Sequence, residues 1–497
     1  MYGLYFGVSV EKIFNLKNTI IFACFSIAWK IFLATSLCLH PDEAYYWLWS
    51  TNLQLSYYDH APMVAYFIKL TTLFSNSELA VRFSTIIATV ILTFLLWKLV
   101  KSLFKSEVVA SAAIIILHSM PILFSVSIIT TPDTPSFLFL SIATFFVWKL
   151  IDSKNQNNWY LIGLFFGLSM LSKYTACLFI MSLFIYMLLD KKLVWFKSYQ
   201  LYLGIIISII CFLPVIYWNW QHDWASFSYQ IGHGLSNEGI RFTYIFEYLG
   251  TQAGIFNVIL FLPTLYIGIK YLFSKNTAKI FIAAFSVPVI LFYVITALKR
   301  LPGGNWPIPA YFTFSIIAAN YFTDGTHFKR KLLKISIILN IVLSVLVGLH
   351  AKFTIFPVEL ISEESAIADT TNWFYSYKDL SEKLLNENCS FVMTPSHQLS
   401  STIAYYSKNK IKTAVLPHKT KKTQYDFWPL PQELTNSTGA FVYEYKDEDS
   451  FFDARKYFND VSSQVPLFVY FRHNLIIKQF VIKKVGTIKS DFKFKNI

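Results

Sequence analysis

Two adjacent carboxylates stand out in the stretch HPDEAYYWLWS, which runs from His40 to Ser50. Asp42 and Glu43 follow a long apolar run and precede a series of large aromatic side chains. In an arbitrary loop, such a pair would be a solvated surface feature or a favourable charge at the start of a helix. The aromatic neighbours favour chemistry instead, because a carboxylate can take a proton from an attacking hydroxyl or hold a divalent cation. We therefore predict that Asp42 and Glu43 are catalytic.

Further ionisable residues occur in short polar stretches between apolar runs. Asp133 lies in TTPDTPSF, Lys173 in LSKYTA and Arg300 in KRLPGGNWPIPAY. Basic side chains can stabilise a departing phosphate, and the Pro-Gly-Gly after Arg300 lets the backbone approach a ligand closely. Lys173 is also compatible with an ordinary snorkelling lysine, and Asp133 with a helix cap. We predict Asp133 as a third catalytic acid, and Lys173 and Arg300 as contacts to a donor phosphate.

Neighbouring residues complete the predicted site. His60, in LSYYDHAPM, is a further candidate for the donor phosphate, although a single histidine in a loop is usually structural. Large aromatic surfaces can stack on sugar faces or line a groove for acyl chains. The residues predicted to contact substrate are Tyr45, Tyr46, Tyr58, Asp59, Tyr174, Asn305 and Trp306. His222 and Asp223 are not predicted as metal ligands, because no second ligand pair lies at metal spacing.

The elements that carry these residues must cross a membrane. The 497-residue chain is 55% hydrophobic and only 14% charged, whereas soluble domains carry about a quarter charged residues. Eleven apolar runs predict membrane spans. They cover residues 20–39, 82–100, 108–129, 135–150, 159–171, 176–189, 201–217, 253–273, 280–298, 308–322 and 335–350. The net charge of +14 sits in short basic clusters between these runs, so we expect a lipid bilayer and no nucleic acid as partner.

The basic residues also predict an orientation. If the N-terminus is cytoplasmic, the inner loops hold most of the lysines and arginines and the outer loops hold few. This asymmetry fits the positive-inside rule and requires an odd number of spans. The candidate site residues then all lie in outer loops, and we expect them to converge on one site. Lys173 and Arg300 break the charge rule on the outer side, which favours a functional role for both.

The sequence changes character after residue 350, where no later run is long and apolar enough to span a membrane. The segments SFVMT, TAVLP, GAFVYEY and LFVYF predict short strands, and residues 399–408 predict a helix. We therefore predict an α-helical polytopic membrane protein of about eleven spans. A transmembrane catalytic domain would cover residues 1–350, and a small α/β domain outside the membrane would cover residues 351–497.

At these residues the chain resembles glycosyltransferase family 39, a branch of the GT-C superfamily. That branch groups the dolichyl-phosphate-mannose protein mannosyltransferases with the bacterial transferases that place aminoarabinose on lipid A. The matching stretches occur in the expected order over most of the chain. They are DEAYYWLW, YYDHAPMVAY, TPDTP, LSKYTA, GGNWPIPAY and, in the tail, TQYDFWP.

The resemblance implies a polyprenyl- or dolichyl-phosphate sugar donor and transfer with inversion to a glycolipid, such as lipid A, or to a protein. It implies that Asp42 is the acid of the first loop, acting as base or as organiser of metal and acceptor. Asp133 then matches the acid of the second loop, and Lys173 contacts the phosphate. Divalent cations, Mg²⁺ or Mn²⁺, are common in the family, with Asp42 as the ligand. We expect a bacterial inner-membrane protein with a cytoplasmic N-terminus and a periplasmic C-terminal domain.

Two departures separate this chain from the aminoarabinose transferases. Those enzymes have an arginine where this chain has Tyr45, and Lys-Pro-Pro where it has His60-Ala61-Pro62, so the transferred sugar stays open. A protein O-mannosyltransferase-like enzyme is the first alternative. A secondary transporter would usually show repeat symmetry, and the sequence shows no paired halves. A non-catalytic envelope assembly factor is the last alternative, and the intact Asp42 and Asp133 argue against it.

Overall fold

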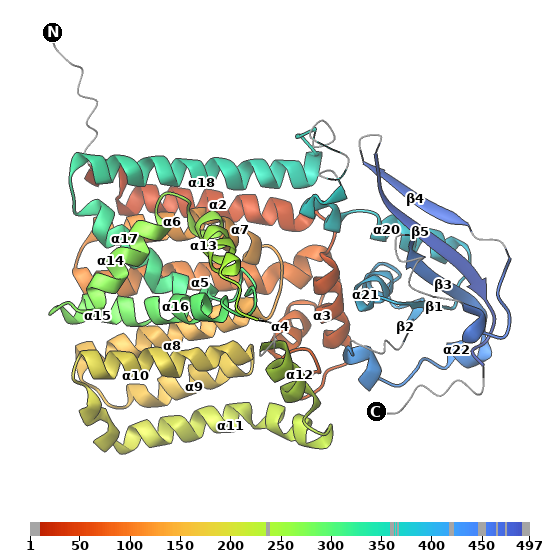
Figure 1. Cartoon of the computed structure of the whole chain (residues 1–497), viewed down its shortest axis with the longest axis horizontal. Helices are drawn as coiled ribbons and strands as arrows, with labels where there is room; N and C mark the ends of the chain where they lie inside the picture. The colour runs from red at the N-terminus through yellow and green to blue at the C-terminus, as the bar shows by residue number, and fades with distance from the viewer. Residues whose placement is uncertain are drawn as a thin grey trace, which may run out of the picture. The chain divides into compact units, whose positions relative to one another are not determined.

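The structure is a computed structural model (Figure 1). It describes residues 10–234, 239–357, 362, 364, 367–416, 422–445, 454–463, 466–472 and 475–489. These residues fall into two compact units, each assembled from separated parts of the chain. The first takes its residues from Met1–Ala34, His60–Phe67 and Arg82–Leu346, and the second from Thr35–Asp59, Ile68–Val81 and Val347–Ile497. The predicted division at residue 350 stays a prediction, and the second unit holds the segment after the first long helix as well as the C-terminal part.

Helices dominate the chain up to residue 353. The longer ones are α2 (Leu16–Ser36), α3 (Pro41–Thr51), α5 (Glu78–Phe104), α6 (Glu107–Ser119), α8 (Asp133–Ser153), α9 (Asn158–Met170), α10 (Leu178–Leu189), α11 (Tyr199–Gln221), α12 (Ala225–Gly234), α13 (Thr243–Phe256), α14 (Phe261–Leu272), α16 (Val287–Thr296), α17 (Tyr311–Thr323) and α18 (His327–Phe353). The shorter ones are α1 (Val10–Ile13), α4 (Met63–Thr71), α7 (Pro121–Val126), α15 (Thr277–Ala284), η1 (Tyr174–Cys177), η2 (Leu193–Lys197) and η3 (Ile308–Ala310). Figure 1 shows α8, α9 and α11 running side by side, and α9 packs against both neighbours.

Six helical stretches among the described residues are long and apolar enough to cross a membrane. They are α2, α5, α8, α11, the stretch Thr277–Thr296 and α18. The bent pair α13 and α14 passes the same test as a unit, and three shorter apolar helices accompany them. Each predicted apolar run overlaps a helix of the structure. The prediction of an α-helical multi-pass membrane protein is confirmed, whereas the number of eleven spans stays a prediction.

Residues 253–273, predicted as one span, form two helices that meet at an angle of 100°. Asn257 takes an extended conformation at the break. Its side-chain oxygen accepts hydrogen bonds from the backbone N–H groups of Ile259 and Leu260, at 3.0 Å each. The asparagine therefore ends α13 and holds the turn that leads into α14, an effect of local hydrogen bonding that an apolar run does not reveal.

Glycines allow α9 and α11 to approach closely. A Cβ atom on Gly163 would lie 2.0 Å from the carbonyl oxygen of Gly204, and one on Gly204 would lie 2.5 Å from the carbonyl oxygen of Trp159. Membrane helices commonly associate through small residues, because these let the backbones come into contact. Gly163 and Gly167 interrupt the predicted apolar run 159–171. In the structure they are the residues that allow α9 to pack closely against α11.

The second unit contains a five-stranded sheet. Its strands are β1 (Phe391–Thr394), β2 (Lys412–Val415), β3 (Gly439–Glu444), β4 (Leu467–Arg472) and β5 (Leu475–Val485), in the order β2-β1-β3-β5-β4. β1 pairs in parallel with β2 and β3, whereas β5 runs antiparallel to β3 and β4. The four predicted strands and the predicted helix are confirmed. β5 is not among the predicted strands, because three lysines interrupt its apolar pattern.

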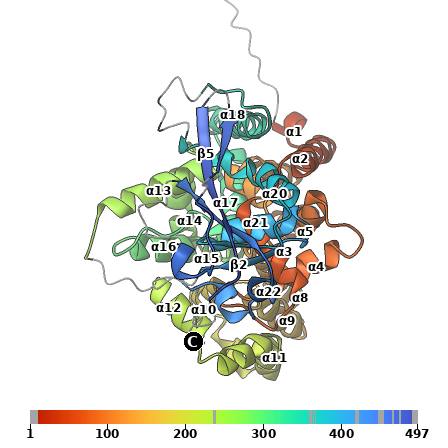
Figure 2. The same ribbon diagram turned by 90° about the vertical axis from the view of Figure 1, so that its right-hand side faces the viewer.

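Both faces of the sheet are covered. Val392, Val442 and Ile482 pack on one face with α20 (Tyr377–Asn386) and α21 (His397–Tyr406), which lie beside the sheet in Figure 2. Met393 and Phe441 pack on the other face. The short elements of this unit are η5 (Thr370–Phe374), η6 (Gln424–Phe427), α22 (Glu433–Asn436) and η8 (Ala454–Lys456). α21 also packs against α3, so the segment that carries the Asp-Glu pair shares one core with the α/β part.

Candidate active site

A buried ion pair joins two predicted site residues in the first unit. Lys173 Nζ lies 2.6 Å from Oδ1 of Asp133, and the two side chains are only 10% and 6% exposed. Asp133 is the first residue of α8, and Lys173 lies between α9 and η1. No side-chain hydrogen bond caps α8 at Pro132, its N-cap residue. Asp133 therefore pairs with the lysine and does not cap the helix.

A third predicted residue reaches the same carboxylate. Nδ2 of Asn305 donates a hydrogen bond to Oδ2 of Asp133 at 2.8 Å. Asn305 follows the Pro-Gly-Gly stretch, and the backbone carbonyl of Gly304 accepts a hydrogen bond from Gln252 in α13 at 3.2 Å. The fold thus brings together Asp133, Lys173 and Asn305 from three separate stretches of the chain.

This arrangement suits the binding of an anion better than general base catalysis. An ammonium group has three N–H donors, and the hydrogen bond seen for Lys173 in the described structure uses one of them. The remaining donors could contact a phosphate. Both carboxylate oxygens of Asp133 already accept hydrogen bonds, Oδ1 from Lys173 and Oδ2 from Asn305.

The other predicted residues of the first unit have varied surroundings. Tyr174 is half-buried, and its hydroxyl oxygen lies 3.1 Å from Oγ of Ser226. Trp306 is half-buried and packs edge-on against a tyrosine of α16, with ring centres 5.7 Å apart. His60 and Arg300 are half-buried as well. The predicted ligand contacts of these four residues stay predictions.

In the second unit, the carboxylate pair lies at the start of α3. Oε2 of Glu43 accepts a hydrogen bond from the backbone N–H of His40 at 2.9 Å. Nδ1 of His40 accepts one from the backbone N–H of Asp42 at 3.2 Å. The two bonds form a capping box, and Glu43 is fully buried. Glu43 therefore holds the start of the helix, and its predicted catalytic role stays a prediction.

Asp42 is the accessible member of the pair. Its side chain is 37% exposed, and its Oδ2 atom lies 3.8 Å from Nδ1 of His40. Its Oδ1 atom accepts a hydrogen bond from Nε2 of Gln398 at 3.0 Å. Gln398 belongs to the first turn of α21. The C-terminal part of the chain thus supplies a partner for the predicted catalytic carboxylate.

A second hydrogen-bond network fixes the TQYDFWP stretch. The Tyr45 hydroxyl donates to Oδ2 of Asp59 at 2.6 Å and accepts from the backbone N–H of Gln424 at 2.7 Å. The Gln424 side chain accepts from the backbone N–H of Tyr58 at 2.7 Å and donates to Gln54 at 3.2 Å. Burial, followed by the charge of Asp59, raises the pKa of Tyr45. Tyr45 therefore stays neutral and serves as a bridge in this network.

The aromatic rings of this region are packed against one another. Tyr45 stacks on Tyr425, with ring planes 3° apart, and Tyr58 stacks on Phe427 with ring centres 5.1 Å apart. Tyr46 is only 8% exposed. Predicted substrate contacts of Tyr45, Tyr46, Tyr58 and Asp59 stay predictions, while the structure gives each of them a place in the core of this unit.

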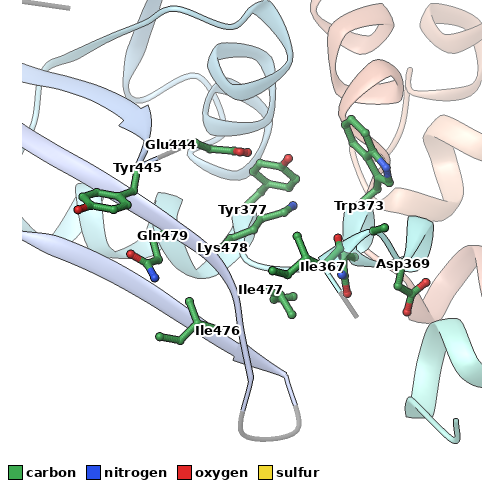
Figure 3. Close-up of a pocket in the computed structure, with 12 residues that line it drawn as sticks. Ile367, Asp369, Trp373, Tyr377, Glu444, Tyr445, Ile476, Ile477, Lys478 and Gln479 are labelled. Carbon is green, nitrogen blue, oxygen red and sulfur yellow. Dashed lines mark hydrogen bonds between the residues drawn. The ribbon is translucent and has the colours of Figure 1, made fainter. Parts of the chain in front are cut away.

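A hollow of about 400 Å³ lies in the same unit, with Trp373 and Tyr377 among its lining residues and Tyr445 across from them (Figure 3). The Trp373 ring stacks on His40, with ring centres 5.2 Å apart. Burial, then the charges of Glu444 and Asp42, raise the pKa of Tyr377. The hollow therefore lies close to the end of α3 that carries Asp42.

The described residues contain no group of three or more His, Cys, Asp or Glu side chains placed to hold a metal ion. A Mg²⁺ ion at a phosphate site commonly needs only one or two carboxylates, because substrate oxygens complete its coordination. The part-exposed carboxylate of Asp42 fits that requirement. His40 and Glu43 do not, because their polar atoms form the cap of α3.

Gln398 and Gln424 are not among the predicted site residues. Gln424 lies in a stretch that the family resemblance covers, but nothing in the sequence indicates that its side chain contacts Tyr58 and Gln54. Gln398 is a neutral residue in an ordinary helical segment, and its partner Asp42 is 356 positions away. Neither contact could be predicted from the charge of the residues or from their spacing in the sequence.

Comparison with known proteins places the chain beside enzymes that transfer sugars. Residues 59–218 match the family model described as dolichyl-phosphate-mannose-protein mannosyltransferase. The chain is 26% identical over 327 residues to the lipid A galacturonosyltransferase RgtD of Rhizobium johnstonii. That alignment covers 64% of this chain and 67% of the relative.

The fold is shared with ArnT from Cupriavidus metallidurans. Its crystal structure bound to undecaprenyl phosphate matches with a TM-score of 0.67 and 11% sequence identity, and its apo structure with 0.65 and 10%. Each match covers 93% of this chain and 97% of ArnT. The predicted fold class and the predicted resemblance are thereby confirmed.

Proposed function

We propose that this chain is a membrane glycosyltransferase with the GT-C fold, and that it moves a sugar from a polyprenyl-phosphate-linked donor to an envelope acceptor. The acceptor is a glycolipid, with lipid A the first candidate. The transfer proceeds with inversion on the outer face of the bacterial inner membrane. In this proposal the N-terminus is cytoplasmic, residues 1–350 form the catalytic membrane domain and residues 351–497 form a periplasmic domain.

The observation that carries the proposal is the buried pair of Lys173 and Asp133. An ammonium group in a membrane unit is costly unless it has a partner and a task. Asp133 and Asn305 fix the orientation of this ammonium, and its remaining donors suit a phosphate leaving group. A polyprenyl phosphate is the leaving group that a site of this kind would meet in a bilayer. The ArnT structure with bound undecaprenyl phosphate supports the same donor class.

The reaction is a single displacement at the anomeric carbon. An acceptor oxygen forms a bond to that carbon while the bond from the carbon to the phosphate oxygen breaks, and the electron pair leaves with the phosphate. Lys173 and Arg300 stabilise the negative charge that develops on the phosphate. If the acceptor is a hydroxyl group, Asp42 takes its proton. If the acceptor is a phosphate of lipid A, no base is needed and Asp42 positions the acceptor.

A divalent cation is part of the proposal as a ligand of Asp42. When bound, such an ion would neutralise charge on the donor phosphate. Addition of EDTA to the purified enzyme, followed by Mg²⁺ or Mn²⁺, tests this point. Transfer that survives EDTA unchanged would remove the cation from the mechanism.

Two sugars are weighed as the transferred group. Galacturonic acid is the first candidate, because RgtD is a lipid A galacturonosyltransferase. Aminoarabinose is less favoured, because Tyr45 and the His60-Ala61-Pro62 stretch depart from the aminoarabinose transferases. A protein acceptor is the second candidate function, supported by the match of residues 59–218 to the protein mannosyltransferase family model.

Mass spectrometry of the envelope glycolipids tests the function. Lipid A would be compared between cells with the intact chain, a deletion, Asp42→Asn and Lys173→Met. We expect one sugar-sized mass to disappear in the deletion and to fall about 100-fold in both variants, the usual effect of removing one charge-stabilising group. Lys275→Met, at an exposed loop position, is the matched control and should leave the product unchanged.

The other outcomes are equally informative. Full transfer by Asp42→Asn would exclude Asp42 as base or organiser, and full transfer by Lys173→Met would exclude Lys173 as phosphate contact. Glycolipids that stay the same in the deletion would favour the protein acceptor, which proteomic analysis of envelope proteins in the same strains would then identify.

A further inference from the structure

A side chain of the α/β part of the second unit contacts Asp42. Nε2 of Gln398 donates a hydrogen bond to Oδ1 of Asp42 at 3.0 Å. The other carboxylate oxygen, Oδ2, lies 3.8 Å from the nearest nitrogen of His40, which is too far for a hydrogen bond. Oδ1 of Asp42 is therefore held by a hydrogen bond, whereas Oδ2 belongs to the part-exposed end of the side chain and is not held by His40.

Gln398 is itself firmly placed on α21. Its backbone carbonyl accepts a hydrogen bond from the Thr402 hydroxyl at 3.0 Å. The Ser396 side chain caps the helix by accepting from the backbone N–H of Leu399 at 3.4 Å. The preceding ring, His397, packs on Tyr45 with ring centres 4.6 Å apart. The side-chain amide of Gln398 is therefore carried by a helix whose first turn is held in place by hydrogen bonds and ring packing.

α21 is in turn fixed against the segment that carries Asp42. The backbone N–H of Leu39 donates to the Tyr406 hydroxyl at 2.7 Å. The rings of Trp47 and Tyr405 pack edge-on, with centres 5.0 Å apart. These contacts lie at the far end of α21 from Gln398, so both ends of the helix are tied to the region around α3.

We propose that Gln398 is a positioning residue for the transfer reaction, holding the Asp42 carboxylate by Oδ1 so that Oδ2 faces the reacting groups. This inference rests on the proposed role of Asp42. A carboxylate that is fixed by one oxygen loses fewer rotamers when substrate binds. The periplasmic part of the chain would then contribute to the chemistry of the first-loop carboxylate.

Substitution by glutamate gives the sharpest test, because Gln398→Glu keeps the shape and adds a like charge beside Asp42. The added charge should change the pH–rate profile, which the loss of a merely structural contact would not do. Gln398→Met keeps the length but removes the donor. It should lower the saturating rate about 10-fold, with little change in the amount of membrane needed for half-saturation.

The assay uses the purified full chain added to membranes of the deletion strain, which contain the natural donor and acceptor. Mass spectrometry of the product gives initial rates at limiting and saturating amounts of membrane between pH 5 and 9. Gln432→Glu, at an exposed position of the same unit, is the matched control and should keep the wild-type profile. Thermal unfolding of each variant reports whether the fold is retained.

The outcomes separate the inference from the proposed function. If Asp42→Asn retains full transfer, the proposed role of Asp42 is wrong, and the role of Gln398, which depends on it, is wrong as well. If Asp42→Asn is inactive but Gln398→Glu and Gln398→Met keep the wild-type rate and profile, the inference alone is wrong. In the supporting case, Gln398→Met lowers the rate in the wild-type background and has no further effect in the Asp42→Asn background. Additive losses would instead indicate a merely structural contact.

Discussion

At the scale of single residues, the pair of Asp133 and Lys173 combines stability with chemistry. Both side chains are buried, so removing one partner leaves the other charge without compensation. Lys173→Met should lower the free energy of unfolding by about 3 kcal/mol. The double variant Asp133→Asn/Lys173→Met removes both charges and should regain most of that loss. Thermal unfolding in detergent measures both, and equal melting temperatures for the single and double variants would contradict the coupling.

A second prediction concerns Asp369, which accepts hydrogen bonds from His350 at 2.8 Å and Arg472 at 3.1 Å. Burial acts to raise the pKa of Asp369, but hydrogen bonds from Thr371 and His350 and the charge of Arg472 outweigh it and lower the pKa below its ordinary 3.8. A lowered folded-state pKa means that the charged form stabilises the fold above the unfolded-state value. That contribution is lost as the pH falls through the folded-state pKa.

Asp369→Asn should therefore melt at a lower temperature than the wild type at neutral pH. The difference should shrink once the pH drops below about 4 and disappear when the wild-type carboxyl is itself protonated. Melting curves of the two proteins from pH 7 to pH 3 check this. A difference that stays constant over the whole range would show that the charge of Asp369 has no part in stability.

At the scale of elements, the contact between α9 and α11 depends on residue size. Gly163→Ala places a Cβ atom 2.0 Å from a backbone oxygen, so the helices must move apart. We expect a loss of about 2 kcal/mol, as for other overpacked contacts. Gly250→Ala and Gly254→Ala are matched controls in α13, where an added Cβ meets nothing within 4 Å. They should be neutral or slightly stabilising, because alanine is the better helix former. Melting temperatures that do not separate Gly163→Ala from these controls would refute the close packing.

The elements were also what the sequence predicts best. Long apolar runs located the membrane helices, and short segments rich in β-branched and aromatic residues located four of the five strands of the described sheet, because both signals are local and strong. The bend at Asn257 and the lysine-rich β5 were missed, since each depends on hydrogen bonds or sheet partners that a local pattern does not contain. At the site, charged residues such as Asp133 and Lys173 stood out in apolar surroundings. Gln398 and Gln424 did not, because a neutral amide acquires its role only through distant partners.

At the scale of the whole molecule, the second unit is not confined to the C-terminal part of the chain. Residues of Thr35–Asp59 share its core, through contacts such as Trp47 with Tyr405 and Tyr45 with Tyr425. A chain truncated after Leu346 should therefore expose the segment around α3 to proteases, even with its membrane helices in place. Limited proteolysis with mass spectrometry of the fragments checks this against the full chain. Equal protection of α3 in both chains would show that the segment folds alone.

Because the second unit combines an early and a late segment of the chain, it cannot assemble until most of the chain has been synthesised. Asp42 emerges early, but its partner Gln398 is made 356 residues later. At about 5–20 residues per second, roughly 20 to 70 seconds pass between the two. During that interval the aromatic residues of α3 lack the surface that will cover them, so they are open to chaperones. An interrupted translation product that lacks α21 would insert its helices into the bilayer but would leave Asp42 without the hydrogen bond from Gln398.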